Sequence, residues 1–462
     1  MSSTRAGGRA RGLSMWRGDP RLPFLDMARS PREMGDFFNR RVLPRVLPGE
    51  KAAAVGVEDF WYSPRGECVV LYELQLGDLL EDPRRWAVAT FSKDDSLQEV
   101  HANHDEHSTG ASSGPVPGPA LYIPEYRCLM EFFPTDWKLP SLIRALDAEE
   151  ITSVLFRDVP DAAHLRSRSR LQAKVLRHRP HKRCVLRYIP ETSEDEGPQA
   201  VVGKVYAQAS RAARSWHTLN TLYAQAAGVI IPKPLGLVKG WNLVLMECVP
   251  GTPMKQVLEG ATSKGQAQQA TRMAAEALAR LHSLEIDSQE LQSVESQLDE
   301  LRKTNLRFRL VAPQLAEQVD ALLNRLVPLA RRSTLGTPSC IHGDCEPSQF
   351  LIAESQAAVV DFDRTGRGDA AVDVGNFMAA LHREAVKGQD DLRELATYFL
   401  TQSQECSARN GLVDRARLFQ VAALVRMALR AFQKSPYANN RTGLDEHVVL
   451  LLQEAAACLA SL

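Results

Sequence analysis

The sequence predicts an α+β fold of two lobes, a β-rich small lobe followed by a helical large lobe, with a small α/β module in front of both. Three observations support this prediction. Residues 22–150 and 151–246 contain stretches in which apolar and polar side chains alternate, as they do in half-buried strands. From 247 to 462 the apolar side chains recur mostly at helical spacing. A short run of strand-like and acidic residues, 339–363, interrupts the helical part.

Length and composition are those of a multidomain globular protein. The chain has 462 residues, 44% of them hydrophobic, which is enough for two or three packed units. The 56 Lys and Arg residues balance 56 Asp and Glu residues, so we expect neither nucleic acid nor a membrane as a partner. No stretch reaches the roughly 18 uninterrupted apolar residues of a membrane-spanning helix. Eight scattered cysteines without a C-x-x-C pair, and no apolar leader, predict a cytoplasmic protein with reduced thiols.

The first 150 residues predict a tail and a small module. Residues 1–21 are rich in Arg and Gly and poor in large apolar side chains, so we expect a disordered basic tail. Within 22–150, Val70, Tyr72 and Leu74 lie on one face of an expected strand, which is typical of a sheet with one buried side. The stretch 101–119 is rich in His, Gly, Ser and Pro and predicts a mobile loop between strands.

The segment 151–246 predicts strands around a single helix, the order of elements that a kinase small lobe needs. Strands are expected at 173–176, 184–188 and 200–206, a helix at 210–226, and two further strands at 236–238 and 243–246.

Three polar residues in the runs 341–352 and 359–363 point to phosphoryl transfer. Asp344 is followed five positions later by Gln349, and Asp361 comes after a short apolar hairpin with expected strands at 350–352 and 358–360. Kinases place a base and two magnesium ligands in this order, and the hairpin would bring Asp361 beside Gln349. We therefore predict a kinase in which Asp344 is the base and Gln349 and Asp361 bind Mg²⁺ together with ATP or GTP. Solvated acids at a turn and a strand end are the alternative that each residue alone would favour.

Lys204 is the candidate for contact with the nucleotide phosphates. It is the one ammonium in an apolar strand, upstream of the expected helix. A kinase lysine is usually paired with a Glu of the next helix, yet no acid occurs between 197 and 246. Either His217 or an acid from another segment must take that place.

The turn between the first two strands of this lobe, 177–183, contains no glycine, so its backbone amides cannot approach phosphates as in a Gly-rich loop. Its cations could clamp phosphates by charge or be solvated: Arg179, Lys182 and Arg183. A hinge that offers backbone groups to adenine, or an ordinary linker, is expected at Met246, Glu247 and Cys248.

His342 precedes an acid suited to act as the base, so we expect it to support the loop. Zinc bound by Cys340, His342 and Cys345 is a competing interpretation, but a fourth ligand at the usual spacing is missing.

Together these residues resemble the aminoglycoside phosphotransferase and choline kinase-like superfamily, which has the protein-kinase-like two-lobed fold. The resemblance covers about 170–385, and its motifs are Leu245-Met246-Glu247, Ala279-Arg280-Leu281-His282, His342-Gly343-Asp344, Asp361-Phe362-Asp363 and Asp373-Val374-Gly375-Asn376-Phe377. It implies that Asp344 is the base, that Gln349 and Asp361 bind Mg²⁺, and that Asp373 braces the catalytic loop, with Asp363 in support.

Gln349 stands where most relatives carry Asn and is similar to the maltokinase branch, which also has an extra module in front of the small lobe. This resemblance favours a sugar or glycoside hydroxyl as acceptor. Aminoglycosides are polycations, whereas the last helices carry a basic series, so we rank antibiotics lower. The series is Arg415, Arg417, Arg426, Arg430 and Lys434. A pseudokinase or nucleotide-binding regulatory module is the alternative; a protein kinase is disfavoured because no A-P-E segment follows Asp361.

Overall fold

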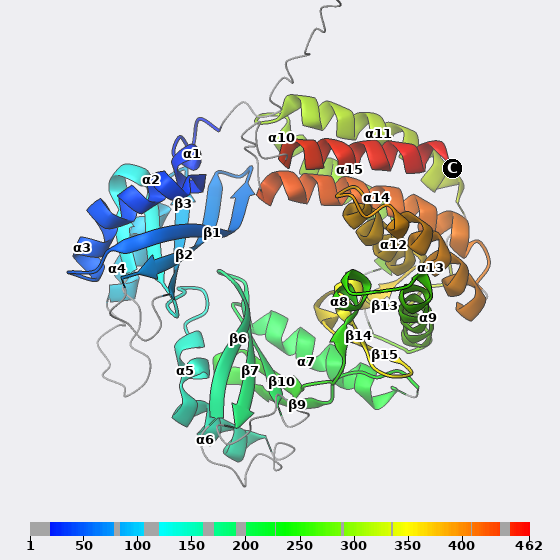
Figure 1. Cartoon of the computed structure of the whole chain (residues 1–462), viewed down its shortest axis with the longest axis horizontal. Coiled ribbons are helices and arrows are strands. Elements are labelled where there is room, and N and C mark those ends of the chain that lie inside the picture. The colour runs from blue at the N-terminus through cyan, green and yellow to red at the C-terminus, as the bar shows by residue number, and fades with distance from the viewer. Residues whose placement is uncertain are drawn as a thin grey trace, which may run out of the picture.

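A computed structural model of the chain describes residues 19–77, 84–105, 120–159, 171–190, 200–226, 228–287, 291–333, 336–407, 409–434 and 444–462. Figure 1 shows three parts: an N-terminal sheet in blue to cyan, a second sheet in green, and a helical part from green to red. Almost all of the predicted basic tail lies outside the described residues.

The N-terminal part is a five-stranded antiparallel sheet with helices packed on it. Its strands are β1 (Ala52–Ser63), β2 (Glu67–Leu76), β3 (Arg84–Ser92), β4 (Ala120–Ile123) and β5 (Cys128–Phe132), in the order β1-β2-β3-β5-β4. The helices before the sheet are α1 (Leu25–Arg29), α2 (Pro31–Phe37), η1 (Phe38–Val42) and α3 (Leu43–Val46). Val70, Tyr72 and Leu74 are fully buried, which confirms the predicted alternation. The predicted loop at 101–119 is wrong for its first five residues, which end helix α4 (Ser96–Asp105); the rest lies outside the described residues.

The second sheet has the strands and the helix predicted for the small lobe. Its strands are β6 (Leu171–Arg179), β7 (Arg183–Pro190), β8 (Val201–Tyr206), β9 (Pro234–Val238) and β10 (Leu243–Glu247), in the order β6-β7-β8-β10-β9, with α7 (Ala209–Ala224) between β8 and β9. Helices α5 (Leu142–Leu146) and α6 (Ala148–Asp158) share one apolar cluster with this sheet, because Leu142, Ile151 and Leu155 pack with Leu186 and Leu243.

Two small sheets carry the motif that the sequence singled out. Strands β14 (Phe350–Ile352) and β15 (Ala357–Val359) form the predicted hairpin, one residue earlier than expected in its second strand, and β11 (Thr252–Pro253) extends it. Strand β13 (Ser339–Ile341) pairs with β16 (Gly366–Gly368), which also pairs with β12 (Leu291–Gln292). Short 3-10 turns follow or precede these strands at η5 (Pro347–Gln349) and η6 (Phe362–Arg364).

The remaining helices form the large lobe. They are α8 (Met254–Glu259), α9 (Lys264–Leu281), α10 (Val294–Phe308), α11 (Pro313–Arg332), α12 (Ala371–Ala385), α13 (Asp391–Ser407), α14 (Leu412–Lys434) and α15 (Leu444–Ala460). Helices α12 and α14 approach closely at Gly375, where a Cβ would lie 2.6 Å from the Ala416 carbonyl oxygen. A β-rich lobe followed by a helical lobe confirms the predicted α+β, protein-kinase-like fold.

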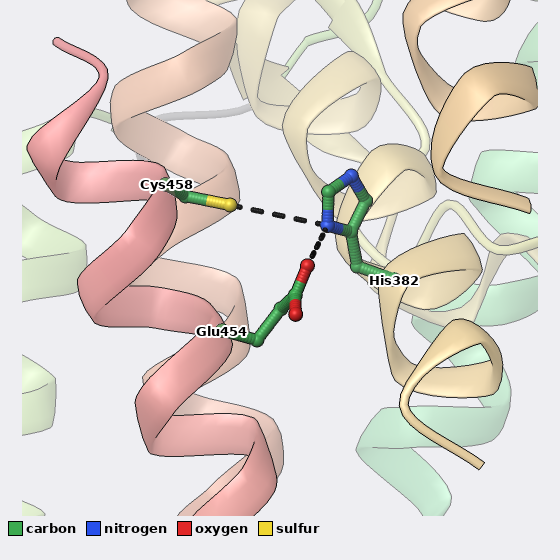
Figure 2. A group of neighbouring side chains, drawn as sticks. All are labelled: His382, Glu454 and Cys458. Carbon is green, nitrogen blue, oxygen red and sulfur yellow. Dashed lines mark hydrogen bonds and ion pairs between the residues drawn. The ribbon is translucent and has the colours of Figure 1, made fainter. Parts of the chain in front are cut away.

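A polar contact joins α12 to α15 at His382, Glu454 and Cys458 (Figure 2). The His382 Nδ1 lies 2.7 Å from Glu454 and 3.9 Å from the Cys458 sulfur, an arrangement that could hold a metal ion. However, the Arg393 guanidinium already donates to both oxygens of Glu454, at 2.9 and 2.8 Å, and burial raises the pKa of Cys458 to about 12. A thiol and a neutralised carboxylate are poor cation ligands, so we interpret this cluster as a structural link between helices.

Within the described part of the chain, every helix is too short or too polar to cross a membrane.

Candidate active site

Asp373, at the start of α12, holds the loop that precedes Asp344. The backbone N–H groups of His342 and Gly343 donate to its two carboxylate oxygens at 2.7 and 2.8 Å, and the His282 ring lies 2.9 Å away. Gly343 has φ +77, and a Cβ there would collide with the Arg364 carbonyl oxygen, so the loop requires glycine. The fully buried carboxylate therefore fixes the backbone from which the Asp344 side chain projects.

His342 links this loop to the segment that carries Asp361. Its Nε2 lies 2.9 Å from the Val360 carbonyl oxygen, while the Asp344 N–H points to its Nδ1 at 3.4 Å. Only a neutral ring protonated on Nε2 satisfies both contacts. The Val360 N–H in turn donates to the Gln349 carbonyl at 3.0 Å, so Asp344, Gln349 and Asp361 stand on backbone segments that are bonded to one another.

The same contacts argue against zinc. Both nitrogens of His342 are engaged, and burial raises the pKa of Cys340 to about 12 and that of Cys345 well above its usual value. Neither thiol is a ready metal ligand at neutral pH, so the competing zinc interpretation has no support in this geometry.

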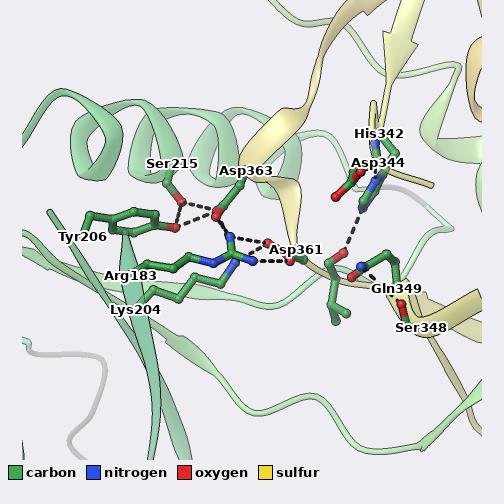
Figure 3. Close-up of polar contacts among 11 residues, drawn as sticks. Arg183, Lys204, Tyr206, Ser215, His342, Asp344, Ser348, Gln349, Asp361 and Asp363 are labelled. Carbon is green, nitrogen blue, oxygen red and sulfur yellow. Dashed lines mark hydrogen bonds and ion pairs between the residues drawn. The ribbon is translucent and has the colours of Figure 1, made fainter. Parts of the chain in front are cut away.

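A half-buried cluster of charges surrounds Asp361 and Asp363 (Figure 3). The Lys204 ammonium donates to Asp361 at 2.7 Å and to Asp363 at 3.2 Å. Arg183 donates to both oxygens of Asp361, at 3.2 and 2.9 Å, and also pairs with Asp363. The Tyr206 hydroxyl also donates to Asp363, at 2.7 Å. In Figure 3, Asp344 and Gln349 lie on the opposite side of Asp361 from these cations.

These contacts determine the charge of Asp361. Burial alone would raise the pKa of its carboxyl, but the charges of Lys204 and Arg183 outweigh burial, and the pKa lies well below its usual range. Asp361 has φ +67, an uncommon conformation that turns its side chain toward the second sheet. Of the two alternatives for the partner of Lys204, an acid from another segment is the one observed: Asp361 and Asp363 take the place of the missing helix Glu.

The glycine-free turn between β6 and β7 is held by carboxylates of the N-terminal part. His181 has φ +62; its N–H donates to Asp136 at 2.8 Å and its Nε2 lies 3.0 Å from Glu131. His178 also contacts Asp136, at 3.1 Å. Burial lowers the pKa of His181, but the Glu131 hydrogen bond and the two carboxylate charges raise it above its ordinary value.

The structure divides the three cations of this turn. Arg183 reaches Asp361, and Arg179 lies close enough to Asp361 and Asp344 to be affected by their charges. Lys182 instead places its ammonium 4.4 Å from the centre of the Trp61 ring on β1. Lys182 therefore connects the turn to the N-terminal sheet and does not join the other two cations.

Two of the three expected hinge residues already use their backbone N–H groups. The Glu247 N–H donates to the Lys233 carbonyl at 2.9 Å, and the Cys248 N–H donates to the Ala200 carbonyl at 3.2 Å. Met246 is buried and pairs with Val202 on β8. A base bound here would therefore need carbonyl oxygens of this segment or the N–H of a residue further along.

The sequence interpretation did not include Glu131 and Asp136. The available signal was an acid in the apolar run Cys128–Phe132, since a charged side chain in a buried strand needs a partner. Nothing in the local sequence indicates that the partner is His181, 50 residues away.

Comparison with known proteins finds one matching family model and several similar structures. The sequence model of the phosphotransferase enzyme family matches residues 192–404. A search of curated proteins finds no match. Similar structures include a choline/ethanolamine kinase family protein from Mesorhizobium loti, with 14% identity over 67% of this chain and 94% of that one and a TM-score of 0.47.

Two further structures are similar to the same extent. A choline kinase from Cryptosporidium parvum is 12% identical over 68% of this chain and 96% of its own, with a TM-score of 0.47. The aminoglycoside phosphotransferase APH(2")-IIa, in a complex with gentamicin, is 16% identical over 68% of this chain and 98% of its own, with a TM-score of 0.47. Likeness at this level carries no information about a shared substrate.

Proposed function

We propose that this protein moves the γ-phosphate of ATP to a hydroxyl group of a small molecule. The match of residues 192–404 to the phosphotransferase enzyme family model supports this proposal and agrees with the predicted resemblance to the aminoglycoside phosphotransferase and choline kinase-like superfamily. The observation that carries the proposal is the bonded arrangement of the Asp344, Gln349 and Asp361 segments beside Lys204 and Arg183. Base, metal ligands and phosphate-binding cations are then adjacent.

Asp344 is the proposed base. Its backbone is fixed through Gly343 and His342, and its side chain is half-buried, so a substrate hydroxyl can approach it. In this role the carboxylate accepts the hydroxyl proton as the oxygen attacks phosphorus.

Gln349 and Asp361 would hold Mg²⁺. They offer an amide oxygen and a carboxylate that stays ionised because its pKa is lowered, which is the donor type this cation prefers. Bound magnesium would neutralise charge on the phosphates. Lys204 and Arg183, which now pair with Asp361, would then be available to the phosphate oxygens. The length of Gln349 and its resemblance to the maltokinase branch favour a sugar or glycoside acceptor.

The test is transfer of labelled phosphate from Mg·ATP to a panel of sugars, amino alcohols and aminoglycosides. We expect at least one acceptor to be labelled, and Asp344→Asn to lower transfer by about 10²- to 10⁴-fold, the usual contribution of a general base. Glu354→Gln, in the exposed turn of the β14–β15 hairpin, is the matched control and should leave transfer unchanged. Equal transfer by Asp344→Asn and wild type would contradict the proposal.

A nucleotide-binding module without turnover is the second candidate. The pairing of both Lys204 and Arg183 with Asp361 favours it, since a metal ligand that stays neutralised cannot serve. Binding of Mg·ATP without labelling of any acceptor would support this candidate, and one labelled metabolite would exclude it.

A further inference from the structure

The basic residues of α14 differ in whether a carboxylate pairs with their charge. Arg415 pairs with buried Asp369 at 2.6 Å, Lys434 pairs with Asp59 of β1 at 3.1 Å, and Arg417 is exposed. Arg426 and Arg430, one helical turn apart, remain. They are the members of the series that lie near the catalytic loop.

Arg426 contacts α12 but keeps unused donor capacity. Its Nη2 donates to the Asn376 Oδ1 at 2.7 Å, and its Nη1 to Gln297 at 3.5 Å. The Arg426 Nε and the Asn376 Nδ2 are both buried and have no hydrogen-bond acceptor among the described residues. Two orphan donors on side chains that are hydrogen-bonded to each other indicate that an acceptor, such as an ordered water or an anionic oxygen, belongs there.

Arg430 has neither a hydrogen bond nor an ion pair with any residue in the part of the chain that the structure describes, although it is only partly exposed. Burial lowers its pKa, and the charge of Arg364 lowers it further, whereas Asp344 and Glu346 act in the opposite direction. Burial likewise lowers the pKa of Arg426 to about 10. The geometry links them to the Asp344 loop: Arg426 donates to Asn376, which lies three residues after Asp373 on α12, and Asp373 holds the backbone that precedes Asp344.

The nearby carboxylates do not balance these cations. Both oxygens of Glu346 accept from Arg383 on α12, at 3.3 and 3.2 Å, so Glu346 is already matched. Asp344 is the proposed base and must stay accessible to a hydroxyl. An uncompensated positive field next to a catalytic carboxylate repels a cationic acceptor and attracts an anionic one.

We propose that the acceptor carries an anionic group, a phosphate or a carboxylate, and that Arg430, with Arg426 and Asn376, forms its binding site beside Asp344. The anion accepts hydrogen bonds from the Arg430 guanidinium and supplies the oxygen that the orphan donors lack. It anchors the substrate so that a hydroxyl elsewhere on the molecule reaches Asp344. This inference rests on the proposed kinase function for the position of the hydroxyl, and on the described side chains alone for the anion.

The test is isothermal titration of the protein loaded with Mg²⁺ and the non-hydrolysable analogue AMP-PNP, which fills the nucleotide phosphate site. Glucose, gluconate and glucose 6-phosphate share a hydroxylated skeleton and differ in charge, and inorganic phosphate serves as a probe with no sugar to misfit. We expect an anion to bind about 10- to 100-fold more tightly than glucose, the ratio that a charge-assisted hydrogen bond gives. The gluconate and glucose 6-phosphate arms distinguish carboxylate from phosphate.

Arg430→Gln should abolish that preference, Arg430→Lys should keep part of it, and Arg417→Gln on the same helix should keep all of it. The proposal is overturned if glucose binds as tightly as both anions, if inorganic phosphate and the sugars all fail to bind, or if Arg430→Gln behaves as Arg417→Gln does. Labelled-phosphate transfer separates the two proposals. Anion binding without phosphate transfer would contradict the proposed kinase function but not the anion site. Phosphate transfer to glucose without any preference for anions would contradict the anion site but not the kinase function.

Discussion

The two five-stranded sheets of this protein have the same strand order, yet only the second contributes cations to the candidate active site. Each sheet runs first, second, third, fifth, fourth, with a helix between its third and fourth strands. In each, the last hairpin turns through a 3-10 helix, η2 (Pro124–Tyr126) or η4 (Lys239–Trp241), that ends in a left-handed residue. The carbonyls of those residues, Arg127 and Asn242, accept from Ser92 and Tyr206, both at 3.0 Å.

This correspondence identifies the residue of the first sheet that is equivalent to Lys204 of the second. Lys204 lies opposite Val244, the second residue after Asn242, and Thr90 lies opposite Leu129, the second residue after Arg127. Thr90 is 1% exposed, and its hydroxyl has no partner among the described residues. Equivalent backbone positions therefore carry an ammonium in one sheet and a buried hydroxyl in the other. The side chains, and not the strand order, determine which sheet can contact phosphates.

The first sheet acts on the second through the turn between β6 and β7. Glu131 and Trp61 both belong to its strands, and they contact His181 and Lys182 in that turn. A Gly-rich loop adapts to phosphates by its own freedom, whereas this turn is held from outside. The second sheet therefore carries the cations, and the first sheet positions them.

The largest expected effect is at the position that differs. Lys204→Met should lower phosphate transfer by about 10²- to 10³-fold, because a preorganised cation on the phosphates is lost. Thr90→Val, the corresponding change in the first sheet, should leave transfer within about twofold and preserve or slightly raise the free energy of unfolding, since a buried unpaired hydroxyl disappears. Transfer assays and chemical denaturation check both; equal losses of transfer would show that the two sheets share the chemistry.

A smaller effect is expected where one sheet positions the other. Glu131→Gln keeps the shape of a buried side chain but removes the charge that faces His181, so the free energy of unfolding should fall by about 1–3 kcal/mol. The Michaelis constant for ATP should rise while Lys204 and Asp344 stay in place. Glu125→Gln, an exposed residue of the same sheet, is the control. An unchanged Michaelis constant in Glu131→Gln would mean that the brace is structural only.

The smallest effect concerns pH. The pKa of His181 is raised in the folded protein, so its pairing with Glu131 and Asp136 stabilises fully below the ordinary value of 6.5 and is lost as the pH rises through the folded pKa. The free energy of unfolding of the wild type should therefore decline above pH 6.5 relative to His181→Asn, whose side chain tolerates a positive φ. Denaturation at pH 6, 7, 8 and 9 gives the difference curve, and a flat curve would contradict the assignment.

Much of the fold could be predicted from local pattern. Alternation located the strands of the second sheet, and the run from Asp344 to Asp361 located the β14–β15 hairpin of the candidate active site within one residue. These features depend on neighbours a few positions apart, which the sequence displays directly. The end of helix α4 was not predicted, because the His, Asn and Asp residues of 101–105 are typical of loops. These residues nevertheless continue the helix that begins at Ser96.

Short runs of residues were enough to predict the order of the elements and the candidate base, and to match residues 192–404 to the phosphotransferase enzyme family model. Only the tertiary structure shows that Asp361 and Asp363 replace the missing helix Glu, and that Glu131 and Asp136 hold the turn. It also shows that Arg430 has no ion-pair partner among the residues that the structure describes. Lys204 and Asp361 are 157 positions apart. Contacts at such separation follow from how whole sheets and helices pack, and no local pattern encodes which buried charge meets which.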